Sequence, residues 1–122
     1  MGLVTYSANG YVSANFVSTI PEQRPLNLIA NDVKNGSDYE WSLIGKYATA
    51  YMGPISINTS LPATETQGQV LHGPLFVANL PSLMGKTLVR NYLVFKRDGE
   101  TYLRLSFAGA STKADVLWKR IA

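Results

Sequence analysis

The chain has no cysteine, a single histidine (His72) and few charged residues, which make up 16% of its 122 residues. The absence of cysteine excludes disulfide bonds, thiolate catalysis and cysteine-ligated zinc. A single histidine also disfavours a histidine-based metal site within one chain. We therefore expect neither a metal nor another cofactor. The length and the 46% hydrophobic content predict one globular domain over residues 1–122.

The chain also lacks any long apolar run. No run approaches ~18 residues, so we expect no membrane span, and the first residues show no basic and apolar secretion signal. We therefore expect a cytoplasmic protein. The net charge is +3, but the basic residues are scattered, which disfavours nucleic-acid binding. A sparsely charged chain of this size is expected either to associate with a second copy or to hold an apolar ligand.

Two hairpin signals are present near the two ends of the chain. Asn9-Gly10 and Asp98-Gly99 are each flanked by β-branched and aromatic residues and predict two-residue type I′ turns. The alternation around these turns and elsewhere predicts strands over 3–7, 11–18, 55–59, 69–77, 87–96, 101–107 and 114–121. Gly73-Pro74 interrupts the fourth of these, which indicates an edge or a bulge.

One helix is predicted after a polar loop. Ser37 and Glu40 have the spacing of a capping box, and the helix is expected to run to about Met52, before Gly53-Pro54. Its single apolar face requires a sheet to cover it. The fold class is therefore mainly β, a small antiparallel barrel of about seven strands with one helix covering an end.

Four stretches of the chain resemble the lipocalin-like domain family, small β-barrel proteins of bacteria and fungi. Residues 2–14 resemble the family's hairpin, in which a Tyr and a turn precede Gly-Tyr-Met-Ser-Ala. Residues 47–53 resemble its helix-to-strand passage, residues 89–92 its Arg-x-Tyr strand and residues 116–120 its closing strand. The resemblance covers nearly the whole chain.

Two departures from the family pattern affect the prediction. The family opens with a strand containing Gly-Thr-Trp, and this chain starts after it, so the barrel is expected to be open or to take a strand from a partner. The family's His-His-Val-Glu segment is replaced by Leu71-His72-Gly73-Pro74-Leu75-Phe76. Any role of that acid is therefore lost.

The resemblance implies a ligand-holding barrel. Family members often lie among genes for natural products, and some barrels of this kind steer the cyclisation or isomerisation of a bound polyketide or terpenoid-like intermediate. This is an analogy at the level of the fold.

His72 is the only side chain that titrates near neutrality without a shifted pKa. It is a candidate general acid or base in the cavity. The alternative is a hydrogen-bonded structural residue beside the Gly73-Pro74 break.

Arg90 and Tyr92 point to one face of a strand, because they lie two residues apart. We expect Tyr102 and Arg104 of the next strand to meet them on that face. Inside a barrel these groups are suited to hold a carboxylate, enolate or pyrone oxygen; on the outside they are solvated surface. The opposite face, with Val89, Leu93 and Phe95 beside leucines, is the more apolar one.

Trp41, Tyr47 and Tyr51 are expected on the helix, where they either line the pocket mouth or plug the end of the barrel. They complete the candidate site: His72, Arg90 and Tyr92 as catalytic residues, and Trp41, Tyr47, Tyr51, Tyr102 and Arg104 as substrate-binding residues.

The leading hypothesis is a cofactor-independent cyclase or isomerase of secondary-metabolite biosynthesis that binds a hydrophobic, oxygen-bearing small molecule and holds it in one conformation. The alternatives are a non-catalytic binding or carrier protein and a subunit whose sheet serves assembly. In each case we expect a homodimer, because the first family strand is missing and the charge is low.

Overall fold

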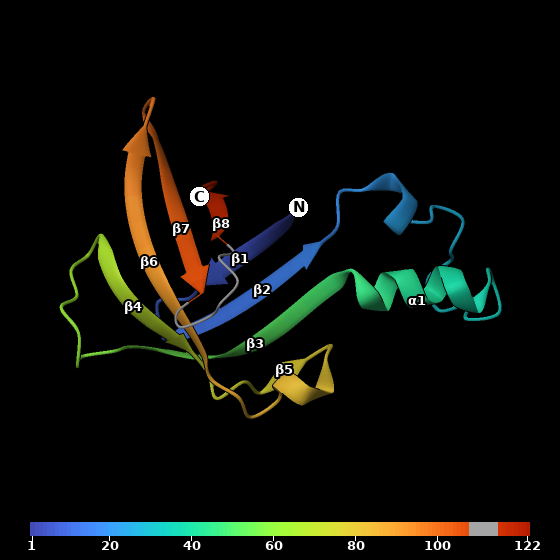
Figure 1. Ribbon diagram of the computed structural model, residues 1–122, viewed down its shortest axis with the longest axis horizontal. Helices are drawn as coiled ribbons and strands as arrows, with labels where there is room; N and C mark the ends of the chain where they lie inside the picture. Colours follow the sequence, from blue (N-terminus) through green and yellow to red (C-terminus); the bar gives the residue numbers. More distant parts are fainter. Residues whose placement is uncertain (108–114) are drawn as a thin grey trace.

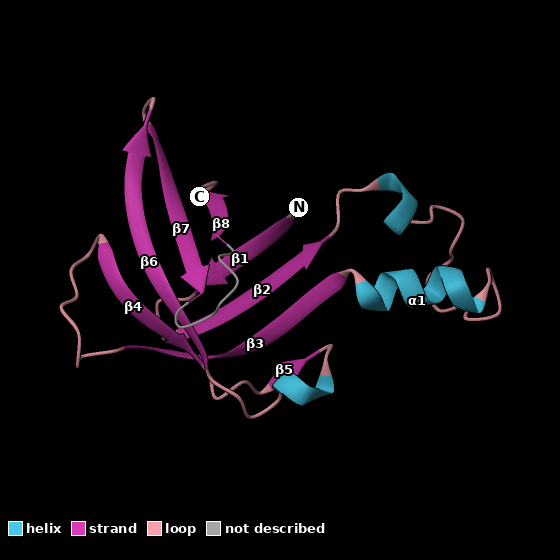
Figure 2. Ribbon diagram, in the orientation of Figure 1, coloured by secondary structure: helices cyan, strands magenta, loops and turns pink. Residues whose placement is uncertain are grey.

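The structure is a computed structural model that describes residues 1–107 and 115–122. Antiparallel strands dominate it, with one α-helix and two short 3-10 turns (Figure 2). In chain order the elements are β1 (Gly2–Tyr6), β2 (Tyr11–Val17), η1 (Pro21–Gln23), α1 (Asp38–Lys46), β3 (Ala48–Ile57), β4 (Gln67–His72), β5 (Val77–Ala78), η2 (Pro81–Leu83), β6 (Leu88–Arg97), β7 (Glu100–Phe107) and β8 (Asp115–Lys119).

The strands form a nearly closed antiparallel barrel in the order β1-β2-β3-β4-β6-β7-β8, and β5 pairs with β3 off this path. The mainly β class, the barrel and the single helix are confirmed. In Figure 1 the sheet curls so that β8 lies close to β1, and α1 lies beyond the end where β2 finishes and β3 begins. Within the described residues, no ladder joins β1 to β8. The barrel therefore has one seam, between its first and last strands.

The two predicted turns differ in outcome. Asp98 and Gly99 both have positive φ, 51° and 77°, and Arg97 pairs with Glu100, as a two-residue type I′ turn requires. The prediction for Asn9-Gly10 was wrong, because only Gly10 has positive φ, 86°.

In this first hairpin the amide of Ser7 donates to the carbonyl of Tyr11 (2.9 Å), and the amide of Gly10 donates to the carbonyl of Ser7 (3.1 Å). Three residues, 8–10, therefore form the loop. Its last residue takes the left-handed conformation, in which a glycine is favoured.

The helix starts where the capping box predicts but ends early. The amide of Glu40 donates to Oγ of Ser37 (3.1 Å), and the amide of Ser37 donates to Oε1 of Glu40 (3.0 Å). The predicted end at Met52 was wrong, because α1 stops at Lys46 and the next residues pair with β2. Long-range pairing outweighs the helical spacing of the apolar side chains here.

The early end of the helix also corrects the strand boundaries. The strand predicted over 55–59 begins at Ala48, and the strand predicted over 69–77 is two strands, β4 and β5, separated by the Gly73-Pro74 break. The last strand, predicted over 114–121, is β8; residue 114 lies outside the described residues. Tyr51 is consequently a strand residue.

Alternation along the strands sets the buried face. Val12 and Ala14 on β2, Tyr51 on β3 and Leu75 form the buried apolar cluster, with Tyr6 among the partly buried residues packed against it. Val12 and Ala14 lie two residues apart on β2, Tyr6 is paired with Val12 and Tyr51 with Ala14, so these side chains point to the same side of the sheet.

Candidate functional site

A cavity of about 1090 Å³ opens at the seam of the barrel. Its inward-facing wall is apolar and aromatic, with Phe16 and Trp118 in edge-on contact at a ring-centroid distance of 6.4 Å. The residues that line it come mainly from β1, β7, β8 and the C-terminal residues: Met1, Gly2, Leu3, Val4, Thr5, Tyr6, Phe16, Val17, Val94, Thr101, Tyr102, Leu103, Val116, Leu117, Trp118, Lys119, Arg120, Ile121 and Ala122. Its volume is of the size that small-molecule sites have.

One polar side chain of the wall starts a row of hydrogen-bonded groups that extends into the core. Tyr6, the last residue of β1, lines the cavity, and its hydroxyl lies 2.9 Å from Nε2 of His72. Nδ1 of His72 lies 3.1 Å from the hydroxyl of Tyr51. His72 is 0% exposed and Tyr51 is 7% exposed. Three strands, β1, β3 and β4, therefore bring two phenols and one imidazole into a single hydrogen-bonded row, called here the Tyr6–His72–Tyr51 row.

Burial shifts the pKa values of this row toward the neutral forms. It lowers the pKa of His72 to about 4, and the positive charge of Arg90 acts in the same direction. Burial raises the pKa values of Tyr6 and Tyr51, while Arg90 opposes both shifts. At neutral pH the imidazole and both phenols are therefore uncharged, and the row holds protons only in hydrogen bonds.

Arg90, on β6, lies on the same side of the sheet as His72, because the register pairs His72 with Leu88 and Val70 with Arg90. The Tyr6–His72–Tyr51 row together with Arg90 is called here the interior cluster, and Arg90 carries its only charge. Its guanidinium lies over the ring of Phe107, 4.1 Å from the centroid, and Nη1 donates to the carbonyl of Val89 (2.9 Å). Burial lowers the pKa of Arg90, and the two phenols act in the opposite direction. In the described part of the chain the one ion pair joins Lys119 to Glu100, and residues 108–114 contain no Asp or Glu. No carboxylate therefore neutralises Arg90.

The structure brings two of the three predicted catalytic residues together. His72 and Arg90 belong to the interior cluster, whereas the hydroxyl of Tyr92 donates to the carbonyl of Thr64 (2.7 Å), and its ring lies against Gly68. Tyr92 shares the face of Arg90, as its spacing predicts, but its polar atom is held by the loop before β4.

The expected meeting of Tyr102 and Arg104 with Arg90 was wrong. The register places Phe107 opposite Arg90, and Tyr102 opposite Phe95. Tyr102 stacks on Phe95 with a ring-centroid distance of 5.5 Å and is one of the residues that line the cavity, and Arg104 lies opposite Leu93 on the outer face. The Asp98-Gly99 turn sets this register. As a result, the candidate residues of β6 lie opposite apolar residues of β7, and the candidate residues of β7 lie opposite apolar residues of β6.

The three predicted aromatic residues are separated. Tyr51 is in the interior row, but Trp41 donates from Nε1 to the carbonyl of Asn35 (2.6 Å), and Tyr47 is the C-cap of α1. Neither Trp41 nor Tyr47 is among the described residues that line the cavity. The helical face that was expected to carry all three aromatic residues does not form, since the helix stops before Tyr51.

Tyr6 is the site residue that the sequence reasoning missed. Its alternation with Val4, opposite Val12 and Ala14 of the next strand, indicates that it points to the apolar side of the hairpin. That pattern was visible. Its proximity to His72, 66 positions away, was not, because it depends on closure of the barrel.

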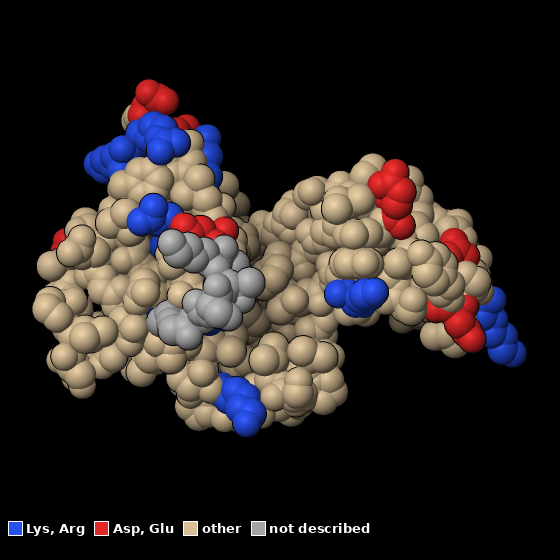
Figure 3. All heavy atoms as spheres, viewed as in Figure 1, with Lys and Arg blue, Asp and Glu red and all other residues tan. Residues whose placement is uncertain are grey.

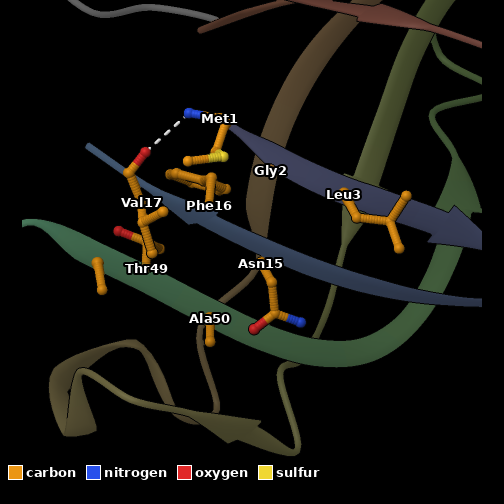
Figure 4. A pocket seen from close by; sticks show the side chains of 9 residues that line it. Met1, Gly2, Leu3, Asn15, Phe16, Val17, Thr49 and Ala50 are labelled. Atoms are coloured by element: carbon orange, nitrogen blue, oxygen red, sulfur yellow. Dashed lines mark hydrogen bonds between the residues drawn. The ribbon is translucent and has the colours of Figure 1, made fainter. Parts of the chain in front are cut away.

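A second, smaller hollow of about 380 Å³ lies where β1, β2 and β3 run side by side (Figure 4). The amino group of Met1 donates to the carbonyl of Val17 (2.8 Å) at its rim. Its lining residues are Met1, Gly2, Leu3, Asn15, Phe16, Val17, Ala48, Thr49 and Ala50. No acid, base or histidine side chain is among them, so the chemistry of the interior lies in the larger cavity.

A lipocalin-like domain model matches residues 1–121. The chain belongs to the lipocalin-like domain family. Comparisons with curated proteins and with solved structures give no significant match. A lipocalin-like barrel suggests small-molecule binding, and this barrel has a cavity of suitable size.

The residues that the structure describes include no group of three or more acidic, histidine or cysteine side chains that is suited to hold a metal ion. In the same ranges, 1–107 and 115–122, no helix has the length and apolar character needed to cross a membrane.

Proposed function

We propose that this lipocalin-like protein binds an apolar, oxygen-bearing small molecule in the seam cavity and directs its cyclisation or isomerisation without a cofactor. The observation that carries the proposal is the combination of an apolar cavity of about 1090 Å³ with the hydroxyl of Tyr6 in its wall, which is hydrogen-bonded to the buried His72 and through it to Tyr51. Polyketide and terpenoid intermediates fit this chemistry, because they are largely apolar and carry a few carbonyl or hydroxyl oxygens. We therefore place the reaction in secondary-metabolite biosynthesis.

The proposed catalysis has two parts. The apolar wall selects one conformation of a flexible substrate, which brings the reacting atoms together. The cluster around Tyr6 and Arg90 polarises a substrate oxygen, where negative charge develops in the transition state. Cyclisation and isomerisation rearrange bonds within one molecule without net oxidation, so this role requires no redox partner.

A carrier protein without catalysis is the second candidate. His72 is fully buried, and both of its ring nitrogens already have phenol partners. This arrangement leaves no imidazole nitrogen to abstract a proton from a ligand directly. It favours recognition of an oxygen over proton abstraction, and recognition alone is sufficient for a carrier.

Binding of the uncharged fluorescent probe N-phenyl-1-naphthylamine tests the cavity. We expect saturable fluorescence enhancement, and we expect Val116→Arg, which places a charge on the inner wall, to weaken binding at least about tenfold. Leu26→Arg is the matched control, because Leu26 is 96% exposed and is not among the residues that line the cavity. Absence of probe binding, or equal binding by the Val116 variant, contradicts the proposed site.

Turnover separates the enzyme from the carrier. The protein is incubated with linear polyketide and terpenoid-like candidates, and mass spectrometry with chromatography follows isomers of unchanged mass. A product that forms only with protein supports the cyclase or isomerase. Retention of every candidate unchanged, with tight binding, supports the carrier.

We also propose a cytoplasmic homodimer that associates along the seam. Leu3 on β1, Leu117 on β8 and Ile121 are 52%, 53% and 78% exposed, respectively, along its two sides. In Figure 3 the charged side chains of this face gather at the tip of the β6–β7 hairpin and around α1, with others below that tip and near β5. Light scattering is expected to give about twice the chain mass of 13.3 kDa, and Leu117→Lys is expected to shift it toward the monomer. A mass of one chain at high concentration contradicts this proposal.

A further inference from the structure

The Tyr6–His72–Tyr51 row limits where its protons can lie. A neutral imidazole has one N–H donor and one acceptor nitrogen, and both nitrogens of His72 have a phenol within 3.1 Å. One phenol therefore donates to the ring, and the other accepts from it. The accepting phenol keeps its own proton, which is free to point at a third group.

Burial decides which phenol has the spare proton. Tyr51 is 7% exposed and packs with Val12, Ala14 and Leu75. Within the described residues its hydroxyl has no hydrogen-bond partner besides His72. A spare proton there would be a buried donor without an acceptor, which is costly. Tyr6 borders the cavity, where water or a ligand can accept a proton. The lower-energy arrangement has Tyr51 donating to Nδ1, and Nε2–H donating to Tyr6.

Arg90 adds a positive charge on the same side of the sheet, because the register pairs His72 with Leu88 and Val70 with Arg90. Its charge acts on Tyr6, Tyr51 and His72, and its guanidinium is stacked on Phe107 without a carboxylate partner. A partly buried guanidinium without a counter-charge, on the same side of the sheet as a row that ends in a phenol with an available proton, favours a negatively charged oxygen.

We propose that the hydroxyl of Tyr6 and the guanidinium of Arg90 form a subsite for an anionic oxygen, a carboxylate, phenolate or enolate, of an otherwise apolar molecule. His72 and Tyr51 are positioning residues, since they hold Tyr6 with its proton directed to the cavity. This inference rests on the proposed function and deepens it: it states which oxygen the cavity recognises and which atoms recognise it.

The probe for the subsite is 4-nitrophenol, whose phenolate absorbs visible light while the neutral phenol does not. We expect the protein to prefer the phenolate over the phenol by about tenfold or more, seen as a lowered pKa of the bound probe in an absorbance titration. Tyr6→Phe and Arg90→Gln are each expected to abolish most of this preference. N-phenyl-1-naphthylamine is expected to bind both variants as it binds the unchanged protein, which shows that the cavity persists.

Cations at the rim of the cavity provide the matched control. Lys119 and Arg120 also line the cavity, but Lys119 is paired with Glu100 (3.0 Å), and Arg120 donates to the carbonyl of Ala122 (2.6 Å). The double variant Lys119→Gln/Arg120→Gln is expected to retain the phenolate preference. Loss of the preference in this variant, with retention in Tyr6→Phe and Arg90→Gln, overturns the subsite.

Nitrogen NMR tests the positioning role directly in the unchanged protein. The chain has one histidine, so its two ring ¹⁵N signals require no assignment by mutation. We expect the Nε2–H tautomer at pH 7. The Nδ1–H tautomer overturns the assignment of Tyr6 as the residue with the spare proton. Binding of N-phenyl-1-naphthylamine without any phenolate preference overturns the subsite alone, whereas failure of both probes to bind overturns the proposed function as well.

Discussion

Replacement of His72 with phenylalanine is expected to lower the free energy of unfolding by about 3 kcal/mol at pH 7. The ring of phenylalanine fills most of the space but offers no hydrogen bond to Tyr6 or Tyr51. A buried polar group that loses its partner costs about 1–3 kcal/mol. The hydroxyl of Tyr51 carries the full cost of the lost hydrogen bond, because Tyr51 is 7% exposed. The hydroxyl of Tyr6 loses less, because it can turn toward the cavity. Urea unfolding followed by tryptophan fluorescence measures the loss.

A double-mutant cycle shows whether the hydrogen bond causes the loss. Tyr51→Phe leaves Nδ1 of His72 without its partner and is expected to cost about 1–2 kcal/mol. Tyr51→Phe/His72→Phe removes both polar groups, so it is expected to cost clearly less than the sum of the two single changes. Tyr39→Phe is the control, because Tyr39 is 71% exposed; its effect is expected to stay within ~0.5 kcal/mol. Additive costs in the cycle contradict the proposed pairing.

The parts of the fold that sequence patterns predicted correctly depend on neighbouring residues. Two positive φ angles at Asp98 and Gly99 are a local requirement that this dipeptide meets. The capping box of Ser37 and Glu40 is likewise closed within four residues. Such turn and capping signals can be recognised in a single sequence, because the interactions that stabilise them involve only residues close together in the chain.

The errors arise where distant strands decide the outcome. Residues 48–52 have helical spacing, but β2 supplies an unsatisfied edge, and pairing with it makes them part of β3. For the same reason Tyr51 was placed on the wrong element, and it lies instead on β3, within the Tyr6–His72–Tyr51 row. Propensity is a weak prior when a neighbouring strand offers a full set of backbone hydrogen bonds.

The candidate site was predictable in composition but not in geometry. His72 stood out as the single histidine and Arg90 by its spacing from Tyr92 on one strand face, and both lie in the interior cluster. Tyr6 gave only the signal of alternation, and its contact with His72 depends on how far the sheet curls. A residue type can be selected from a sequence, whereas a contact between β1 and β4 requires the closed barrel.

The buried imidazole is expected to make stability depend on pH in a definite window. The pKa of His72 is lowered from 6.5 to about 4 in the folded protein. Between these values the unfolded chain binds a proton that the folded protein does not, so stability rises with pH. This contribution is present in full above about pH 6.5, and it is lost progressively as the pH falls toward 4. A shift of this size corresponds to about 3 kcal/mol, a large part of the stability of a small domain.

Urea unfolding between pH 7.5 and 4.5 measures this loss, with His72→Phe as the matched variant. We expect the unchanged protein to lose stability steadily below pH 6.5, while the variant loses much less over pH 6.5 to 5. The capping carboxylate of Glu40 also loses its favourable contribution on acidification, since hydrogen bonds from the Ser37 backbone amide lower its pKa below the usual 4.5, but that loss belongs to a lower pH and occurs in both proteins. The ring ¹H and ¹⁵N signals of His72 provide the direct check, because the chain has one histidine. They are expected to stay at their neutral positions down to about pH 5; an ordinary titration near pH 6.5 contradicts a buried imidazole held between two phenols.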